Sequence, residues 1–489
     1  MRYKAALVFV LSAGLVSVSV CGQSQDYREK YEQFKKQAQA DYGSFRDECN
    51  KKYADFLRQS WDRYKGNTPL PLPMDDKPVP PKPYEPLVED KPVVVKPVDV
   101  TPVVPAPVPQ PKPVEPVREV PSPTDDGFAI DFYGVKCTVR LPDYAKLTVN
   151  DCRPASIAAG WEKLCGKEMN NALRDCLEAR LRYNLCDWAY LDFLYQLAGE
   201  YCSNRNSATL LSAYLYCQSG YQMRLGEDNG RLVMLYGSRH SIFDKPYYVV
   251  DATTFYPYGE TSGSLSICNA AFEGETPLSL AIDKEQLFGK RLSEPRAITS
   301  RDYPEVSAET AVPTELVGFY DTYPTSAIGG NPLTRWAMYA NVPLAAEAKD
   351  QLYPALRKVI ERLPALEAAE KLLNWVQTGF VYEYDDKVWG HDRAFFAEET
   401  LYYPYCDCED RSILFSRIVR DLLGLDVALI YYPGHLATAV CFKDEVKGDA
   451  MTVGGRRFTV CDPTYIGAPV GAQMPGLAYD KAQALLLDR

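Results

Sequence analysis

Histidine is scarce in this chain: only three occur in 489 residues, at His240, His391 and His435. A site that needs an imidazole therefore has only these three side chains to draw on. Positive charge is also limited, because 54 lysines and arginines face 65 aspartates and glutamates and leave a net charge of −11. No basic stripe runs along the chain, and such a stripe is the usual footprint of nucleic-acid binding. We therefore expect no nucleic acid as a partner.

Long apolar runs are missing after the N-terminus. There, Arg2 and Lys4 precede a mostly apolar stretch, and small residues follow around Cys21, which is the pattern of a secretory signal. Nothing later approaches the roughly 18 apolar residues of a membrane helix, so no membrane span is expected. The mature protein is predicted to be secreted or periplasmic. Cleavage is favoured over a lipid anchor at Cys21, because Val20 is bulkier than lipoprotein processing usually accepts.

Two elongated segments follow the predicted signal. Large or apolar residues recur about every 3.6 positions from Tyr27 to Phe56, which predicts an amphipathic helical arm. Its apolar face needs a partner, either the same chain or another protein. More than half of the 37 prolines then fall between Pro69 and Pro123. Because proline removes backbone donors, this stretch is predicted to be an extended linker with polyproline II character.

Globular sequence begins after the linker and divides into two α+β domains. The predicted boundaries are a signal at 1–22, the arm at 23–66, the linker at 67–126, and domains at 127–325 and 326–489. Residues 201–204 are similar to 405–408, and 249–251 are similar to 460–462. If the first domain is a degenerate copy of the second, Asn204 stands where a nucleophile is expected, and that domain serves binding or structure. The alternative is a chance similarity of one helix and one strand.

Three segments of the second domain carry the residues of a thiol site. Cys408 opens an amphipathic helix, His435 begins a strand-like run and Asp462 ends another, and neighbours in this series are 27 positions apart. A thiol becomes a strong nucleophile when it loses its proton, and a helix N-terminus beside an imidazolium favours that loss. A carboxylate beside the ring sets its tautomer and supports its charged form. We therefore predict that Cys408 is the nucleophile, His435 the base and Asp462 the residue that orients the base.

Acidic residues crowd the start of the predicted helix, at Asp407, Glu409 and Asp410. They suit the helix dipole, but they repel a thiolate. We expect Arg411 or Arg417 to neutralise part of this charge.

These segments resemble those of the transglutaminase-like superfamily, a papain-like branch of thiol enzymes. The resemblance covers about 363–471 and depends on Cys-Glu-Asp at 408–410, Pro-Gly-His at 433–435 and Asp-Pro-Thr at 462–464. It implies a papain/transglutaminase-like α+β domain, a covalent thioester, and acyl transfer to water or to an amine. The family also pairs the cysteine's own N–H with an upstream side chain as an oxyanion donor. The candidates for that donor are Trp375, Gln377 and Tyr402.

Tyrosines are plentiful near the predicted site. Tyr405, Tyr432 and Tyr465 are predicted to contact a peptide or a glycan-linked peptide. The alternative is that these rings belong to the core and that only their hydroxyls reach the surface.

The cysteines of this region also allow a metal site or a disulfide to be considered. A zinc site built from Cys406, Cys408 and His435 has an unusual Cys-x-Cys spacing and no evident fourth ligand. No metal and no other cofactor is therefore predicted. Cys441 and Cys461 lie on the strands that carry His435 and Asp462, so they are candidates for a cross-strand disulfide in an exported protein.

Taken together, the sequence predicts an exported cysteine peptidase or amidase that cleaves amide bonds through a Cys-His-Asp triad. Hydrolysis is favoured over crosslinking, because water is the default acceptor and no amine site or calcium loop is evident. The alternatives are a protein-crosslinking transglutaminase and a catalytically silent scaffold that binds peptide or glycan. The expected partners are a peptide or protein substrate and, through the N-terminal helix, another protein.

Overall fold

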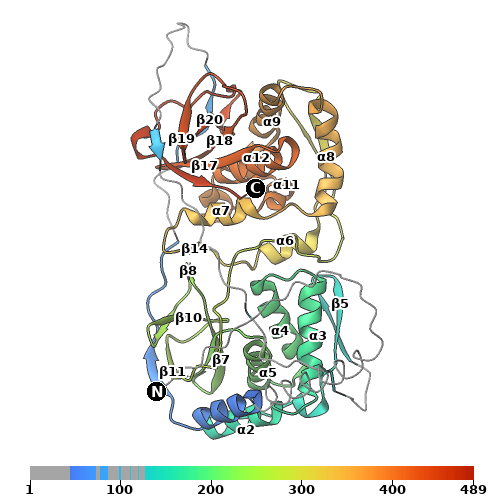
Figure 1. The fold of residues 1–489 in the computed structure, drawn as a ribbon, viewed down its shortest axis with the longest axis vertical. Helices are drawn as coiled ribbons and strands as arrows, with labels where there is room; N and C mark the ends of the chain where they lie inside the picture. Colours follow the sequence, from blue (N-terminus) through green and yellow to red (C-terminus); the bar gives the residue numbers. More distant parts are fainter. Residues whose placement is uncertain are drawn as a thin grey trace, which may run out of the picture.

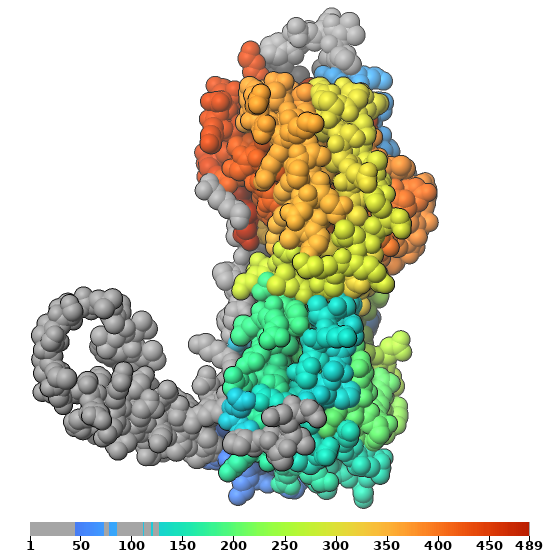
Figure 2. Space-filling model, turned by 90° about the vertical axis from the view of Figure 1, so that its right-hand side faces the viewer, coloured from blue at the N-terminus to red at the C-terminus, as the bar shows by residue number. Residues whose placement is uncertain are grey.

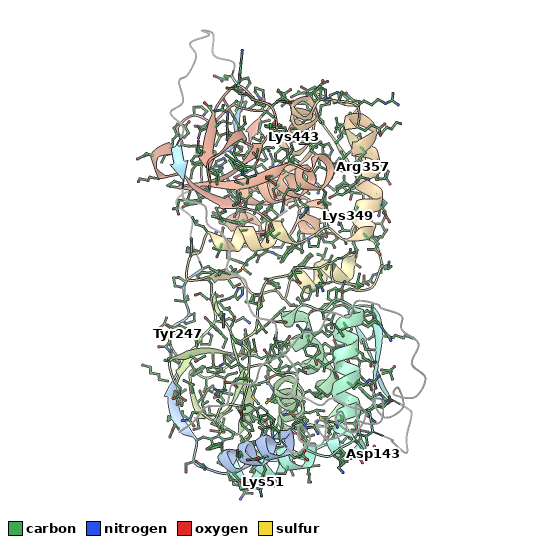
Figure 3. All side chains as sticks on the ribbon, in the orientation of Figure 1. Lys51, Asp143, Tyr247, Lys349, Arg357 and Lys443 are labelled. Atoms are coloured by element: carbon green, nitrogen blue, oxygen red, sulfur yellow. The ribbon has the colours of Figure 1, made fainter. Side chains whose placement is uncertain are left out.

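The computed structural model describes residues 45–72, 78–85, 98–100, 111, 119–120 and 127–488. It is 36% helical and 25% strand, which confirms the α+β class. Two lobes lie end to end, with the green upstream lobe below the orange and red downstream lobe (Figure 1), and the space-filling view shows the same elongated body (Figure 2). Side chains fill both lobes, from Lys51 and Asp143 at the lower end to Lys443 in the upper lobe (Figure 3). The predicted signal lies outside the described residues.

The upstream lobe packs helices against an antiparallel sheet. Its helices are α2 (Pro154–Leu164), α3 (Met169–Arg182), α4 (Asp187–Tyr201) and α5 (Arg205–Gln218). The sheet has the order β1 (Asp62–Lys65), β11 (Ser264–Cys268), β6 (Met223–Asp228), β7 (Arg231–Gly237), β10 (Thr253–Pro257), β9 (Tyr248–Val250). A hairpin of β4 (Phe128–Phe132) and β5 (Val135–Val139) contacts α3 and α4. Helix α5 is buried along nearly its whole length between α4 and the sheet, which makes it the centre of this lobe.

The downstream lobe repeats this plan. Its helices are α7 (Thr334–Asn341), α8 (Ala346–Ile360), α9 (Ala365–Gly379), α11 (Ala397–Tyr402) and α12 (Cys408–Leu423). The sheet has the order β22 (Gln483–Leu486), β17 (Asp426–Tyr432), β18 (His435–Cys441), β20 (Arg456–Cys461), β19 (Ala450–Val453), β3 (Val98–Val100). A short parallel pair, β15 (Val381–Tyr382) and β16 (Tyr405–Cys406), lies just before α12.

Smaller elements connect the lobes and complete their edges. They are β2 (Lys82–Pro83), β8 (His240–Ile242), β12 (Arg296–Thr299), β13 (Ser307–Thr310), α6 (Thr314–Tyr320), β14 (Ser326–Ile328), α10 (Asp385–Val388), β21 (Tyr465–Ile466) and 3-10 turns at Asp143–Ala145 and Tyr479–Lys481. Tyr320 of α6 stacks on Phe396 of the downstream lobe with 3.9 Å between ring centroids. Buried apolar residues are continuous across this junction, so the two lobes share one core.

Five strands follow the central helix in the same spatial order in both lobes. After α5 the sheet order is β11, β6, β7, β10, β9, and after α12 it is β22, β17, β18, β20, β19. When the five strands of each sheet are numbered by their order in the chain, both sheets have the spatial order fifth, first, second, fourth, third. The start of α5 in the upstream lobe therefore corresponds to the start of α12 in the downstream lobe.

Helix α12 forms where the sequence predicted it. The carboxylate of Asp410 accepts a hydrogen bond from the backbone N–H of Asp407 at 3.1 Å, which caps the first turn. Apolar residues at helical spacing, such as Ile413, Leu414 and Ile418, are fully buried against the sheet. The helix ends at Gly424, which is in the left-handed region with φ 63°.

Segments from the N-terminal part of the chain lie on both lobes. Residues 45–57 form a helix that docks on the upstream lobe, where the Tyr53 ring lies 4.7 Å from that of Trp161. The arm therefore finds a partner in its own chain over these residues, although Phe45 and Phe56 are exposed. Strands β2 and β3, which come from the proline-rich region, pair with the downstream lobe (blue in Figure 1). The prediction of a linker did not include these pairings.

Two further expectations can be compared with the fold. None of the described helices is long and apolar enough to cross a membrane. All thirteen cysteines of the described part of the chain are free thiols. Cys461 lies opposite Thr438, whereas Cys441 lies opposite Asp426. The predicted disulfide between Cys441 and Cys461 is therefore wrong, because the strand register keeps the two residues apart.

Replacing Gly424 tests the end of α12. An L-residue in the left-handed region costs about 1–2 kcal/mol, so Gly424→Ala should lower the free energy of unfolding by about 1 kcal/mol. The control is Gly199→Ala in the interior of α4, where an added Cβ meets nothing within 4 Å. The control should be neutral or stabilising by about 0.5–1 kcal/mol. Denaturant unfolding measures both, and a loss of equal size in the two variants would contradict this account of the helix end.

Candidate active site

Cys408 is the first residue of α12. Its side chain is only 6% exposed. The thiol donates a hydrogen bond to Oε2 of Glu409 at 3.1 Å. In this structure the sulfur therefore points to a carboxylate rather than to a base.

His435 and Asp462 form a close pair. His435 begins β18, Asp462 directly follows the neighbouring strand β20, and Nε2 of the ring lies 2.9 Å from Oδ2 of the carboxylate. The second carboxylate oxygen accepts the backbone N–H of Thr464 at 2.8 Å, which holds Asp462 in place. Both side chains of the pair are 1% exposed. With Nε2 engaged by Asp462, the other nitrogen, Nδ1, is left to act as a base, and it is buried without a hydrogen-bond partner among the described residues.

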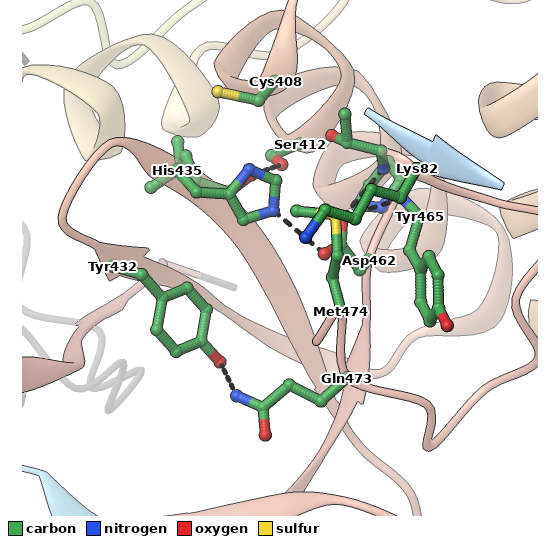
Figure 4. A network of polar contacts seen from close by, with 12 residues as sticks. Lys82, Cys408, Ser412, Tyr432, His435, Asp462, Tyr465, Gln473 and Met474 are labelled. Carbon is green, nitrogen blue, oxygen red and sulfur yellow. Dashed lines mark hydrogen bonds and ion pairs between the residues drawn. The ribbon is translucent and has the colours of Figure 1, made fainter. Parts of the chain in front are cut away.

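The start of α12 lies beside this pair. One turn after Cys408, the hydroxyl of Ser412 donates to the carbonyl of Leu436 at 3.0 Å, which joins the helix to β18 directly after His435. Figure 4 shows the imidazole ring between Asp462 and the end of the helix that carries Cys408. Three distant segments therefore meet at one place, while the thiol is turned toward Glu409 instead of the ring.

Burial and negative charge both oppose a thiolate here. Burial raises the pKa of Cys408 well above its usual value, and the charges of Glu409 and Asp407 raise it further. The backbone N–H of Leu436 acts in the opposite direction on the same pKa. Burial, together with the charge of Glu409, also raises the pKa of Asp385 to about 8. Ionisation of the thiol therefore makes ionisation of the nearby carboxyl groups less favourable, and the reverse also holds.

The two expected arginines have partners other than the acids at the helix start. The guanidinium of Arg411 donates to the backbone carbonyls of Gln377 at 3.0 Å and Phe380 at 2.8 Å. Arg417 forms an ion pair with Asp421, further along α12. Arg411 lies close enough to lower the pKa of Cys406 through its charge, so the expectation that one of the arginines neutralises part of the negative charge stays a prediction.

Carboxylates beside Cys408 are close enough to share a cation. Ligand oxygens of Asp385, Asp407 and Asp410 lie within 4.8 Å of one another, and so do those of Asp385, Asp392 and Glu409. Oxygen ligands of this kind suit Ca²⁺ or Mg²⁺. Both oxygens of Asp410 already accept backbone N–H groups, at 2.8 and 3.1 Å. Acidic clusters are also common without a bound ion, so this geometry alone does not establish a metal site.

The predicted oxyanion donors have other contacts. The indole of Trp375 is fully buried and donates to the carbonyl of Ile298 at 2.9 Å. The amide of Gln377 donates to the carbonyl of Asp462 at 2.9 Å and so positions the loop that carries the carboxylate. Tyr402 is 40% exposed at the end of α11. None of the three is bonded to the thiol among the described residues.

Tyr382 is a neighbour of the thiol that the sequence analysis missed. Burial raises the pKa of Tyr382 well above its usual value, and the charge of Cys408 is the next largest cause. The residue lies opposite Cys406 in the parallel pair β15–β16, two positions before the nucleophile candidate. A phenol at this place is a suitable donor to an oxyanion. Its only signal in the sequence is a valine-tyrosine pair after α9, which does not reveal that it pairs with 405–406.

The three predicted substrate contacts differ in exposure. Tyr432 is fully buried opposite His435, and its hydroxyl accepts from Nε2 of Gln473 at 2.7 Å (Figure 4). Tyr465 is 6% exposed, whereas Tyr405 is 42% exposed. Of the three, only Tyr405 is exposed, so the core alternative describes Tyr432 and Tyr465.

No protein-family model matches this chain, and no curated protein matches it either.

Changing Glu409 to glutamine tests the electrostatics of the thiol. Glu409→Gln removes a negative charge beside Cys408 and keeps an acceptor, so the thiol pKa should fall. Below that pKa the thiolate fraction, and with it the rate of alkylation, changes about tenfold per pKa unit. Iodoacetamide should therefore modify Cys408 faster at neutral pH, with the rate profile shifted toward lower pH.

The control for this change is Glu398→Gln. Glu398 is equally buried and accepts the N–H of Ala345 at 2.7 Å, away from the thiol. This variant should leave the pH profile of Cys408 where it is. An unchanged profile in Glu409→Gln, or the same shift in both variants, would count against the proposed charge effect.

Proposed function

We propose that this chain is a thiol-dependent acyl-transfer enzyme that cleaves amide or peptide bonds. The observation that carries the proposal is the ring of His435, whose Nε2 contacts Asp462 at 2.9 Å while its buried Nδ1 has no partner among the described residues. A free, oriented base nitrogen beside a cysteine at a helix start is the arrangement that activates a thiol. The helix packed on an antiparallel sheet supports a papain/transglutaminase-like fold for the downstream lobe.

In the proposed reaction, Sγ of Cys408 turns from Glu409 to His435 and transfers its proton to Nδ1. The thiolate attacks the amide carbon, and the backbone N–H of Cys408 with the Tyr382 hydroxyl stabilises the oxyanion. The imidazolium then protonates the leaving amine as the carbon–nitrogen bond breaks, which leaves a thioester. A water molecule, deprotonated by His435, cleaves the thioester and restores the thiol. Asp462 keeps the ring in the required tautomer throughout.

Binding without catalysis is the second candidate function. It is favoured by the raised pKa of Cys408 and by the hydrogen bond from the thiol to Glu409. A thiol in that state is a weak nucleophile. The two functions differ in whether His435 can accept the proton of the Cys408 thiol.

We infer that the upstream lobe is a degenerate copy of the downstream lobe, because five strands follow the central helix in the same order. Asn204 caps α5 as Asp407 caps α12, so Arg205 stands at the position of Cys408. Arg231 begins β7 and Tyr258 follows β10, at the positions of His435 and Asp462. The similarity of 249–251 to 460–462 is then misaligned, because β9 corresponds to β19 and β10 corresponds to β20. A cavity of about 430 Å³ beside Asn204 and Tyr258 supports a binding role for this lobe.

Export to the periplasm or the exterior is part of the proposal. It is based on the pattern in residues 1–22. Most of the free cysteines are buried, and burial raises the pKa of, for example, Cys176 and Cys217. Such thiols react slowly with oxidants, which is compatible with their staying unpaired in an oxidising compartment.

Alkylation tests the proposed nucleophile. In the intact chain at neutral pH, Cys408 should react with iodoacetamide faster than Cys441, although Cys441 is the more exposed thiol. His435→Ala should slow the reaction of Cys408 by about 10²-fold or more, since a general base contributes about 10²–10⁴-fold. Peptide mapping by mass spectrometry measures both sites in one sample, so Cys441 is an internal control. Equal rates at the two thiols, unaffected by His435→Ala, would favour the binding function.

A further inference from the structure

Residues 78–85 lie against the loop before His435. The backbone N–H of Val79 donates to the carbonyl of Gly434 at 2.9 Å. Gly434 is the residue directly before His435. This proline-rich piece is distant in sequence, yet it is bonded to the turn that holds the proposed base.

The same segment pairs with the loop after Asp462. Strand β2 runs parallel to β21, with Lys82 opposite Tyr465 and Pro83 opposite Ile466. The backbone N–H of Tyr84 then donates to the carbonyl of Ile466 at 2.9 Å. The segment therefore bonds to both chain segments that carry the histidine and the carboxylate.

Side chains of the segment add to these backbone bonds. The ring of Tyr84 meets that of Tyr465 edge to face at 5.4 Å, and both Val79 and Tyr84 pack on the apolar cluster that includes Met474. The ammonium group of Lys82 donates to the carbonyl of Pro475 at 2.8 Å. Figure 4 includes Lys82, Tyr465 and Met474 in the same polar network as the triad.

These contacts define a docking strip, formed by Gly434, Tyr465, Ile466 and Pro475. Two of its contacts join backbone N–H groups to the carbonyls of Gly434 and Ile466, and such contacts recognise an extended chain whatever its side chains are. The prolines of the segment have no N–H, and they favour an extended backbone. A peptide with a donor at two positions and an aromatic ring near its end fits the strip as an added strand.

We propose that the docking strip is the peptide-binding site of the enzyme, that it takes an extended, proline-containing peptide, and that residues 78–85 occupy it in the resting chain. The proposal rests on the proposed function, because it treats the region beside the triad as the substrate site. With the segment in place, Cys408, His435 and Asp462 are 6%, 1% and 1% exposed. A substrate that pairs with the strip must displace this segment, because the segment already occupies the carbonyls of Gly434 and Ile466.

Peptide binding tests the strip directly. The probe is a fluorescent peptide with the sequence of residues 78–85, and the receptor is the full chain in which those residues are replaced by glycine and serine. The probe should bind this receptor saturably in an anisotropy titration. It should bind the intact chain at least about tenfold more weakly, because the tethered segment competes at high effective concentration. No saturable binding, or equal binding to both chains, would overturn the proposal.

Two controls define the contacts. A probe that carries Tyr84→Ala should bind at least about tenfold more weakly, because it loses the aromatic contact with Tyr465. If the replaced chain does not fold, the single variant Tyr84→Ala in the full chain serves as receptor and should bind the unaltered probe more tightly than the intact chain does. Tyr64→Ala is the matched change on the added edge strand β1 of the other sheet, and it should leave probe binding at the level of the intact chain. A similar gain in both tyrosine variants would overturn the assignment of the strip.

Alkylation distinguishes the proposal for the docking strip from the proposal for catalysis. If both proposals hold, Cys408 reacts faster in the replaced chain, and the added probe slows it again. If the probe binds but Cys408 shows no selective reactivity in either chain, the nucleophile assignment fails and the strip stands as a binding site. If Cys408 is selectively reactive but the probe does not bind, the strip fails and the proposed function stands.

Discussion

The pairing of β18 with β20 determines where the candidate site of this chain is located. Opposite residues such as Thr438 and Cys461 set the register, and this register brings the first residue of β18 next to the residue that follows β20. The preceding hairpin turns through Pro433 and Gly434, with Gly434 at φ 78°, so it leaves little freedom for slippage. A shift of one residue would send His435 to the opposite face of the sheet. The contact between the ring and Asp462 is therefore a consequence of the sheet.

Negative charge is the second constraint on the site. Asp407 and Asp410 are buried with the thiol, and burial raises the pKa of both carboxyl groups well above the usual value. Each ionised group makes ionisation of its neighbours less favourable. Arg411 lies close by and gives its donors to carbonyl oxygens, so among the described residues it forms no ion pair with these carboxylates. The reactivity of Cys408 is thereby coupled to the protonation of the helix start.

Local patterns revealed the central elements of this fold. The amphipathic pattern that begins at Cys408 predicted α12, and the runs at His435 and before Asp462 are strands as expected. Contacts between distant segments were not predictable in this way. The pairing of Tyr382 with Cys406, and of β2 and β3 with the downstream lobe, joins residues whose sequences carry no signal of their partner. The prediction of a disulfide between Cys441 and Cys461 was wrong for the same reason, because strand register depends on the whole sheet.

The predicted site residues also fall into two groups, those that local sequence identified and those that depend on contacts in the folded chain. Residue type and spacing pointed to Cys408, His435 and Asp462, since each begins or ends a regular element. The oxyanion donors could not be chosen from sequence, because a donor is useful only if its N–H or O–H is free. The indole of Trp375 is engaged by Ile298, and that competition is visible only when the chain is folded.

The upstream lobe has the same strand order but lacks the cysteine, histidine and aspartate of the candidate site. At the equivalent helix start, Asn204 accepts the N–H of Ser207 at 2.9 Å, which is an ordinary stabilising cap. Arg231, at the position of His435, forms an ion pair with Asp228, and the hydroxyl of Tyr258, at the position of Asp462, donates to Asp192 at 2.6 Å.

Each of these replacements has a local partner, whereas the downstream site leaves Nδ1 of His435 and an oxygen of Glu409 buried without one among the described residues. Buried polar groups without partners cost free energy. Unsatisfied groups at the downstream helix start, beside satisfied groups at the equivalent upstream positions, are what a functional site requires of an otherwise shared framework. The difference between the lobes therefore favours chemistry at the downstream helix start over a purely structural role.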